Sequence, residues 1–201
     1  MTECVGTRMG ESRVHETPTS TEVIREYGID LVRQGSQEGA TSVGCRLVYL
    51  TDCHQSVSLE VAGRRDQQNR DEGKLDLKVS KGMTGAEISY LGMAGELAFC
   101  LMENLMPDIG WKQKMLWDCL WKGLRVDVKT TRRMWEPHLN VVPWKKDKSD
   151  RPDVYVLMVD LCNGWYRYMG WLGSEEIFGG RYTVDGQISV PWECLKREDI
   201  Q

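Results

Sequence analysis

The sequence has few of the features that mark membrane proteins, secreted proteins and ATP-driven enzymes. No apolar run approaches the roughly 20 residues that a helix needs to cross a bilayer. The first twenty residues contain no apolar segment like that of a secretory signal. The glycines near residues 177–182 lack the Lys and the Ser or Thr of a P-loop. We therefore expect a cytoplasmic protein that needs neither a membrane nor a nucleoside triphosphate.

Histidine is scarce, and the cysteines form no recognisable motif. The chain has three His and seven Cys, without a CxxC pair, so a structural zinc site is not expected. Scattered single cysteines fit a reducing compartment, where they behave as small apolar residues. His15, His54 and His138 show no spacing typical of a nucleophile or a metal site. We expect none of them to be catalytic.

The composition is that of a globular protein with an uneven charge distribution. Hydrophobic residues make up 41% and charged residues 28% of 201 residues, which suits one domain with a small N-terminal appendage. The net charge is −4, yet residues 111–151 hold eleven Lys and Arg against five Asp and Glu, a local net of +6. A basic field around a few carboxylates suits a polyanion that is brought to a metal ion.

The pattern of apolar residues predicts an N-terminal extension over residues 1–55 and a main domain over residues 56–201. In the extension we expect a partly disordered tail over 1–20, a helix over 20–35 and a short strand over 43–50. In the main domain we expect helices over 56–73 and 84–106 and extended segments over 74–79, 112–120, 124–131, 138–144, 153–161, 164–173 and 182–195, with a helical turn at 174–178.

The helix over residues 84–106 is apolar almost all round, which indicates a buried helix. Thr84 can cap it, with Glu87 at the capping-box position. Gly92 and Gly95 weaken a helix, so we expect close packing against another element there. The order of elements predicts an α/β fold, bordering on α+β, in which a mixed sheet carries this helix on one face.

The stretch GLRVDVKTTRR, residues 123–133, has an unusual polar face. Asp127 and Lys129 are two residues apart, so they project from the same side of a strand. Asp118 stands on the preceding strand, across a short turn, and can lie beside Asp127. Two neighbouring carboxylates repel unless a cation lies between them, and Mg²⁺ commonly uses one or two carboxylates. A solvated strand face would nevertheless explain Asp127 and Lys129 taken alone.

Glu96 adds a third carboxylate within the apolar helix. A buried carboxylate needs a counter-charge or a metal ion. Arg64, Arg65 and Asn69 lie along the preceding helix, and one of the arginines can supply the counter-charge. A salt bridge and a metal ligand therefore both remain open for Glu96.

These residues resemble the PD-(D/E)XK nuclease superfamily. The stretches GELAF, WDCLWKGLRVDVKTT and DVYVLMVDL are similar to its helical Glu, its Asp plus D-x-K hairpin and its next core strand. The tail YMGWLGSEEIF and ISVPWECLK resembles small uncharacterised members encoded by phages. The likeness covers about residues 56–198. Trp117, not Pro, precedes Asp118, and the literal MPD at 106–108 lies too far upstream to belong to the hairpin.

The resemblance implies a restriction-endonuclease-like core and a metal-dependent DNA endonuclease. Mg²⁺, or Mn²⁺ in its place, would be held by Asp118, Asp127, the Val128 carbonyl and Glu96. Lys129 would position or activate the attacking water and stabilise negative charge. Such enzymes often act as homodimers, but nothing in the chain indicates a dimer face. A viral member would work in the cytoplasm of its host.

Several residues near the hairpin are candidates for contact with the substrate phosphates: Thr130, Arg132, Arg133 and, in a basic loop over 143–152, Lys145. A solvated connection explains that loop equally well. The alternative function is a catalytically inactive nuclease-like fold that binds nucleic acid or protein as a phage accessory factor.

Overall fold

The computed structural model describes residues 46–73, 82–109, 117–142 and 151–198. The predicted tail and helix over 1–35, the extended segment over 74–79 and Lys145 lie outside these residues. A five-stranded sheet forms the centre, in the order β1-β6-β5-β3-β2. Its strands are β1 (Arg46–Tyr49), β2 (Cys119–Trp121), β3 (Leu124–Thr131), β5 (Val154–Asp160) and β6 (Trp165–Gly173).

The sheet is mixed. Strand β3 runs parallel to β5, whereas the pairs β1–β6, β5–β6 and β2–β3 are antiparallel. The predicted hairpin is present, and its described first strand is short. Asn163 and Gly164 form the tight turn between β5 and β6, with both residues in the left-handed region at φ 50° and 82°.

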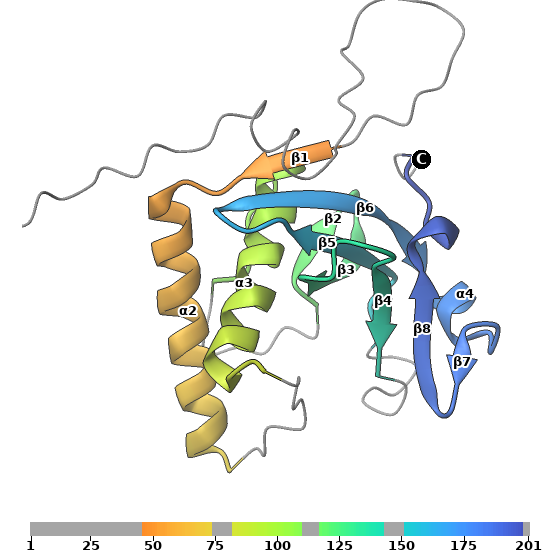
Figure 1. The fold of residues 1–201 in the computed structure, drawn as a ribbon, viewed down its shortest axis with the longest axis horizontal. Helices are drawn as coiled ribbons and strands as arrows, with labels where there is room; N and C mark the ends of the chain where they lie inside the picture. Colours follow the sequence, from red (N-terminus) through yellow and green to blue (C-terminus); the bar gives the residue numbers. More distant parts are fainter. Residues whose placement is uncertain (1–45, 74–81, 110–116, 143–150, 199–201) are drawn as a thin grey trace, which may run out of the picture.

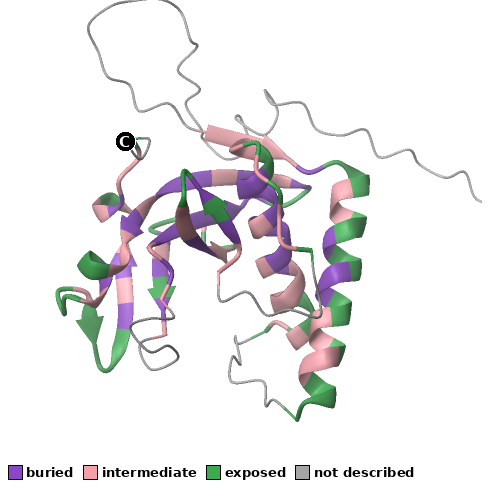
Figure 2. Ribbon diagram, turned by 180° about the vertical axis from the view of Figure 1, so that it is seen from behind, coloured by how far each residue is buried: buried purple, intermediate pink, exposed green. Residues whose placement is uncertain are grey.

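Two helices cover one face of the sheet (Figure 1). Helix α3 (Gly85–Met102) packs on the sheet, and α2 (Asp52–Asp71) packs outside it. The predicted capping box of Thr84 and Glu87 is confirmed, since each residue's side chain accepts from the other's backbone N–H. Helix α2 begins at a Thr51 cap that the ring of His54 completes. Figure 2 shows the result: α3 is largely buried and α2 exposes its outer side.

A second layer lies against the other face of the sheet. It consists of a small sheet in the order β4-β8-β7 and the short helix α4 (Ser174–Phe178). Its strands are β4 (His138–Val141), β7 (Thr183–Val184) and β8 (Gln187–Pro191). Strand β5 is buried along its whole length, as its apolar run predicts, because Val154, Val156 and Met158 face the helices while Tyr155, Leu157 and Val159 face the second layer.

The predicted α/β class with a mixed sheet and a buried helix is confirmed. Strand β1 lies in the predicted extension, yet it pairs with β6 and so belongs to the central sheet. None of the described helices is both long and apolar enough to cross a membrane.

Candidate functional site

The hairpin β2–β3 brings Asp118 and Asp127 together. Its turn uses Lys122 and Gly123 at φ 52° and 83°, the left-handed pair that a tight hairpin needs. Cys119 pairs with Val126, and Asp118 directly precedes Cys119, at the end of β2 that lies nearer Asp127. The backbone N–H of Asp118 donates to Val126 O at 2.7 Å.

The Asp118 side chain occupies the edge of β3. Its Oδ2 accepts from the Val128 N–H at 2.6 Å. A residue's N–H and C=O point to the same side of a strand, so the Val128 carbonyl is also directed toward this edge. Carboxylate and carbonyl oxygens therefore gather where the described part of β2 ends.

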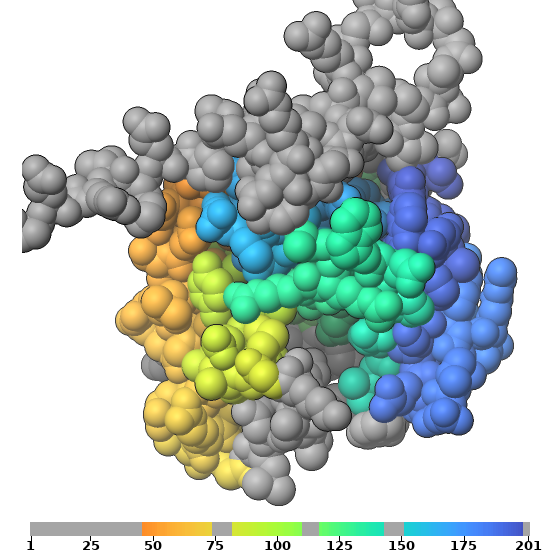
Figure 3. Space-filling view, in the orientation of Figure 1, coloured from red at the N-terminus to blue at the C-terminus, as the bar shows by residue number. Residues whose placement is uncertain are grey.

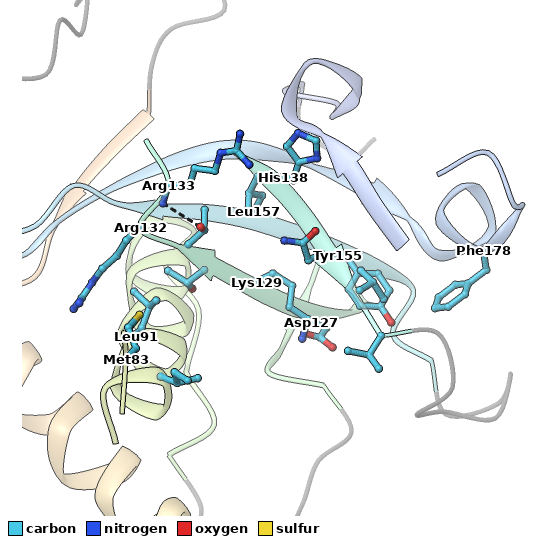
Figure 4. A pocket seen from close by; sticks show the side chains of 16 residues that line it. Met83, Leu91, Asp127, Lys129, Arg132, Arg133, His138, Tyr155, Leu157 and Phe178 are labelled. Carbon is cyan, nitrogen blue, oxygen red and sulfur yellow. Dashed lines mark hydrogen bonds and ion pairs between the residues drawn. The ribbon is translucent and has the colours of Figure 1, made fainter. Parts of the chain in front are cut away.

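Asp127 and Lys129 form an ion pair on the face of β3 that meets the second layer. The Lys129 ammonium donates to Asp127 Oδ1, and Asp127 is only 7% exposed. Val126 and Val128 project to the opposite face, into the core under α3. Figure 4 shows the two charged side chains lying together near the ring of Tyr155.

Glu96 lies on α3 and is held by α2. Arg65 Nη1 lies 2.9 Å from Glu96 Oε2, and Arg65 Nη2 donates to the Asp108 carbonyl at 2.5 Å. The salt bridge to an arginine of the preceding helix is therefore confirmed as a partner of Glu96. Glu96 nevertheless lies close enough to the hairpin for the charges of Asp127 and Lys129 to shift its pKa.

Burial raises the pKa of Glu96, and Asp127 adds to the rise, while the cations Arg65 and Lys129 oppose it. For Asp118, burial acts together with the charges of Glu96 and Asp127 to raise the pKa well above its usual range. The pKa of Lys129 is also raised. Burial alone would lower it, but the negative charges of Asp127 and Asp118 outweigh the effect of burial. The four predicted residues thus share one electrostatic neighbourhood.

A pocket of about 640 Å³ opens beside the ion pair, lined by residues of α3, β3, β4, β5 and α4. Three of its lining side chains are cations, Lys129, Arg132 and Arg133, and its one carboxylate is Asp127. Glu96 and Asp118 do not line it. The pocket therefore favours an anionic ligand at the Asp127–Lys129 end of the site.

The predicted phosphate-binding residues have different surroundings. Thr130 lines the pocket, but its Oγ1 is buried against Gly95 without a hydrogen-bond partner among the described residues, so this hydroxyl does not face a phosphate. The Nε of Arg132 lies 3.0 Å from the buried carboxylate of Asp160, and Figure 4 shows its side chain pointing away from Lys129. Arg133 extends toward His138. Of the three described candidates, Arg133 is the best placed.

The donor atoms at the hairpin edge fit a hard divalent cation in their chemistry. Asp118, Asp127 and the Val128 carbonyl supply oxygen, and a cation would oppose the burial and the carboxylate repulsion that together raise the pKa of Asp118. The described residues contain no group of three or more His, Cys, Asp or Glu side chains arranged to hold a metal ion. Each carboxylate is turned instead to a partner in the chain: Val128 N–H, Lys129 or Arg65.

Tyr155 and Asn140 also line the pocket, although the sequence did not single them out. Tyr155 is buried, and this burial together with the charge of Asp127 raises its pKa to about 12. It stands in a continuous apolar run, where an aromatic residue signals only a strand. Asn140 comes from β4, whose position depends on pairing with a strand about fifty residues later. No local pattern marks either residue.

The profile of a family of unknown function (DUF5843) matches residues 40–167 of the chain. The matched segment contains Glu96, Asp118, Asp127 and Lys129. No curated protein matches the chain, and no solved structure matches it. Because the match covers more than half of the chain, the protein belongs to this family.

Proposed function

We propose that this member of the family of unknown function is a metal-dependent DNA endonuclease of the PD-(D/E)XK type, built on a restriction-endonuclease-like core. The observation that carries the proposal is the grouping of charges at the hairpin: Asp118 accepts from Val128 N–H within reach of the charge of Asp127, and Lys129 is paired with Asp127. A solvated strand face would not bury Asp127 to 7% exposure or raise the pKa of Asp118. The proposed setting is a cytoplasm, that of the host if a phage encodes the protein.

Asp118, Asp127 and the Val128 carbonyl would hold Mg²⁺, or Mn²⁺ as a substitute, with Glu96 holding the metal or its water. The bound ion would neutralise charge on the phosphate and lower the pKa of a bound water. For the carboxylates to reach it, Asp118 has to exchange its bond with Val128 N–H, and Asp127 its pair with Lys129. Arg65 holds Glu96 in position for this arrangement.

Lys129 acts as a fixed positive charge. Because Asp127 and Asp118 raise its pKa against the effect of burial, the ammonium stays protonated at neutral pH. Its role is to orient the attacking water and to stabilise the negative charge that develops on the phosphorus oxygens. Arg133, at the pocket rim, would hold a neighbouring phosphate.

A cleavage assay tests this proposal. Purified protein is incubated with supercoiled, linear and branched DNA, with Mg²⁺ or with EDTA, beside Lys129→Ala and Asp127→Asn. We expect metal-dependent cutting that each substitution lowers by at least roughly 10²-fold, the usual loss for one electrostatic group. Lys122→Ala is the control, since Lys122 belongs to the same hairpin but does not line the pocket. Cutting that persists in both site variants would overturn the assignment.

A second candidate is a nuclease-like fold that binds nucleic acid or protein without cutting. One observation favours it: every carboxylate of the site already has a partner within the chain. The two functions separate in the same assay, because a binding protein retains DNA in a gel-shift experiment while producing no cleavage with Mg²⁺ or Mn²⁺. Cutting both strands at one site would further require two copies of the chain, which analytical ultracentrifugation with DNA would detect.

A further inference from the structure

Trp135 is a large aromatic side chain exposed to solvent beside the candidate site. It is 78% exposed, whereas every other tryptophan in the described residues is buried or half-buried. It lies in the connection between β3 and β4, residues 132–137. Tryptophan carries a large flat apolar surface with a polar N–H, which suits contact with the flat ring of a ligand.

Three hydrogen bonds hold the backbone of this connection, two of them donated by residues of β6 and of the segment after β8. Arg167 Nη2 donates to the Met134 carbonyl at 3.2 Å, and Arg133 Nε donates to the Trp135 carbonyl at 3.1 Å. The Trp192 N–H donates to the Pro137 carbonyl, also at 3.2 Å. The position of Trp135 is therefore set by the folded domain, and its ring is presented on a supported backbone.

Residues on both sides of Trp135 in the chain line the pocket. Arg132 and Arg133 precede it and line the pocket, and His138 and Asn140 follow it and line the same pocket. Figure 3 shows the connection, in teal, on the surface between α3 and the C-terminal strands. In the chain, Trp135 is flanked by the exposed charged residues Arg132, Arg133 and Glu136, a setting that suits a charged partner better than an apolar protein surface.

We propose that Trp135 stacks on an unpaired base of a nucleic-acid strand whose backbone contacts Arg133 and leads into the pocket at Lys129. Proteins that bind single strands combine a cationic track with exposed aromatic rings, because every base offers a flat face for stacking. A paired base inside a duplex does not offer that face. The inference rests on the proposed function and narrows its substrate class to DNA with unpaired nucleotides, such as single strands, flaps or branch points.

Fluorescence anisotropy tests the inference without requiring cleavage. The full chain is titrated, in EDTA and again with Ca²⁺, into a fluorescein-labelled thymidine oligonucleotide and into a fully paired hairpin duplex. Alanine in place of a stacking aromatic costs about 1–3 kcal/mol per base, so Trp135→Ala should weaken single-strand binding by roughly 5- to 150-fold. Duplex binding should change much less.

Two further substitutions separate stacking from apolar contact. Trp135→Phe keeps an aromatic ring and should retain most of the affinity, whereas Trp135→Leu keeps apolar volume and should lose as much as Trp135→Ala. Leu59→Ala is the matched control, since Leu59 is 62% exposed on α2, away from the pocket. Circular dichroism of each variant checks that the fold is retained.

The outcomes are distinguishable from those of the proposed function. Trp135-dependent binding of single strands without any metal-dependent cutting would uphold this inference and remove the nuclease assignment. Cutting that is equal in wild type and Trp135→Ala, on single-stranded as on paired DNA, would overturn the inference and leave the nuclease. Full affinity in Trp135→Leu, or no single-strand binding by the wild type, would also overturn it; the former would indicate apolar contact with the strand in place of ring stacking.

Discussion

At the scale of residues, the candidate site concentrates negative charge in a place that water reaches poorly. Asp118 and Glu96 have raised pKa values because burial disfavours their ionised forms and because the carboxylates act on one another. Asp118 still has a structural task, since its Oδ2 accepts from Val128 N–H at the edge of β3. The negative charge of Asp118 therefore destabilises the fold, whereas its oxygen stabilises the edge of β3 as a hydrogen-bond acceptor.

Neutralising Asp118 should stabilise the protein at neutral pH. The folded pKa lies above the unfolded value of about 3.9, so the wild type loses stability as the pH rises from about 4 toward neutrality. Asp118→Asn keeps the acceptor for Val128 N–H and carries no charge. We expect its free energy of unfolding in urea, without divalent cations, to exceed that of the wild type at neutral pH and to converge with it in acid.

Asp153→Asn supplies a comparison with the opposite sign. The hydrogen bonds from Arg125 lower the pKa of Asp153, so its charge stabilises the fold above the unfolded pKa, and that stabilisation is lost as the pH falls. The Asn variant should be less stable than the wild type at neutral pH. If Asp118→Asn were destabilising there as well, the unfavourable charge assigned to Asp118 would be wrong.

At the scale of elements, α3 and β3 approach each other at one point. The predicted close packing is confirmed at Gly95, where an added Cβ would lie 1.8 Å from Thr130 Oγ1. It is wrong at Gly92, where no atom of another element in the described part of the chain lies within 4 Å of such a Cβ. Both glycines fall in the same apolar helix, so sequence alone could not tell which one faced the strand.

The two glycines provide a matched pair of substitutions. Gly95→Ala should lower the free energy of unfolding by about 1–3 kcal/mol, the usual cost of overpacking, because Thr130 or the helix has to move. Gly92→Ala should raise it by up to about 1 kcal/mol, since Ala favours a helix and the site has room. Urea unfolding of both variants checks this difference. Equal effects would mean that α3 is rotated from the position described.

At the scale of the whole molecule, the central sheet is buried on both faces, and each face contributes to its own hydrophobic core. The helices pack on one face, the second layer packs on the other, and β5 contributes alternate residues to both. The pocket lies where α3, β3 and the second layer meet, so its shape depends on both layers being in place. We therefore expect the described domain to unfold as a unit.

Leu139→Ala tests that unity. Leu139 is fully buried in the second layer, so its truncation should cost about 2–5 kcal/mol. Because the layers share β5, circular dichroism and tryptophan fluorescence should report the same shifted urea transition. Leu120→Ala is the control: Leu120 is 54% exposed, and a change within about 0.5 kcal/mol is expected. Two separate transitions, with only one shifted, would show independent layers.

Local patterns in the sequence determined several strands and the start of one helix. Period-two alternation indicated β3, an apolar β-branched run indicated β5, and Thr84 with Glu87 indicated the start of α3. Asp127 and Lys129 were set on one face by the same alternation, and the short turn brought Asp118 close enough for the charge of Asp127 to act on it. These features depend on residues close together in the chain, whose geometry follows from strand and helix periods.

Only the tertiary structure decided the long-range features. In the folded chain Arg65 is the partner of Glu96, and the Thr130 hydroxyl lies against Gly95. Strand β4 pairs with β8 and contributes residues to the wall of the pocket. The tertiary structure also left Trp135 exposed on a supported backbone beside that pocket. The physical reason is that periodicity states which side of an element a residue occupies, whereas the packing of distant elements determines what that side meets.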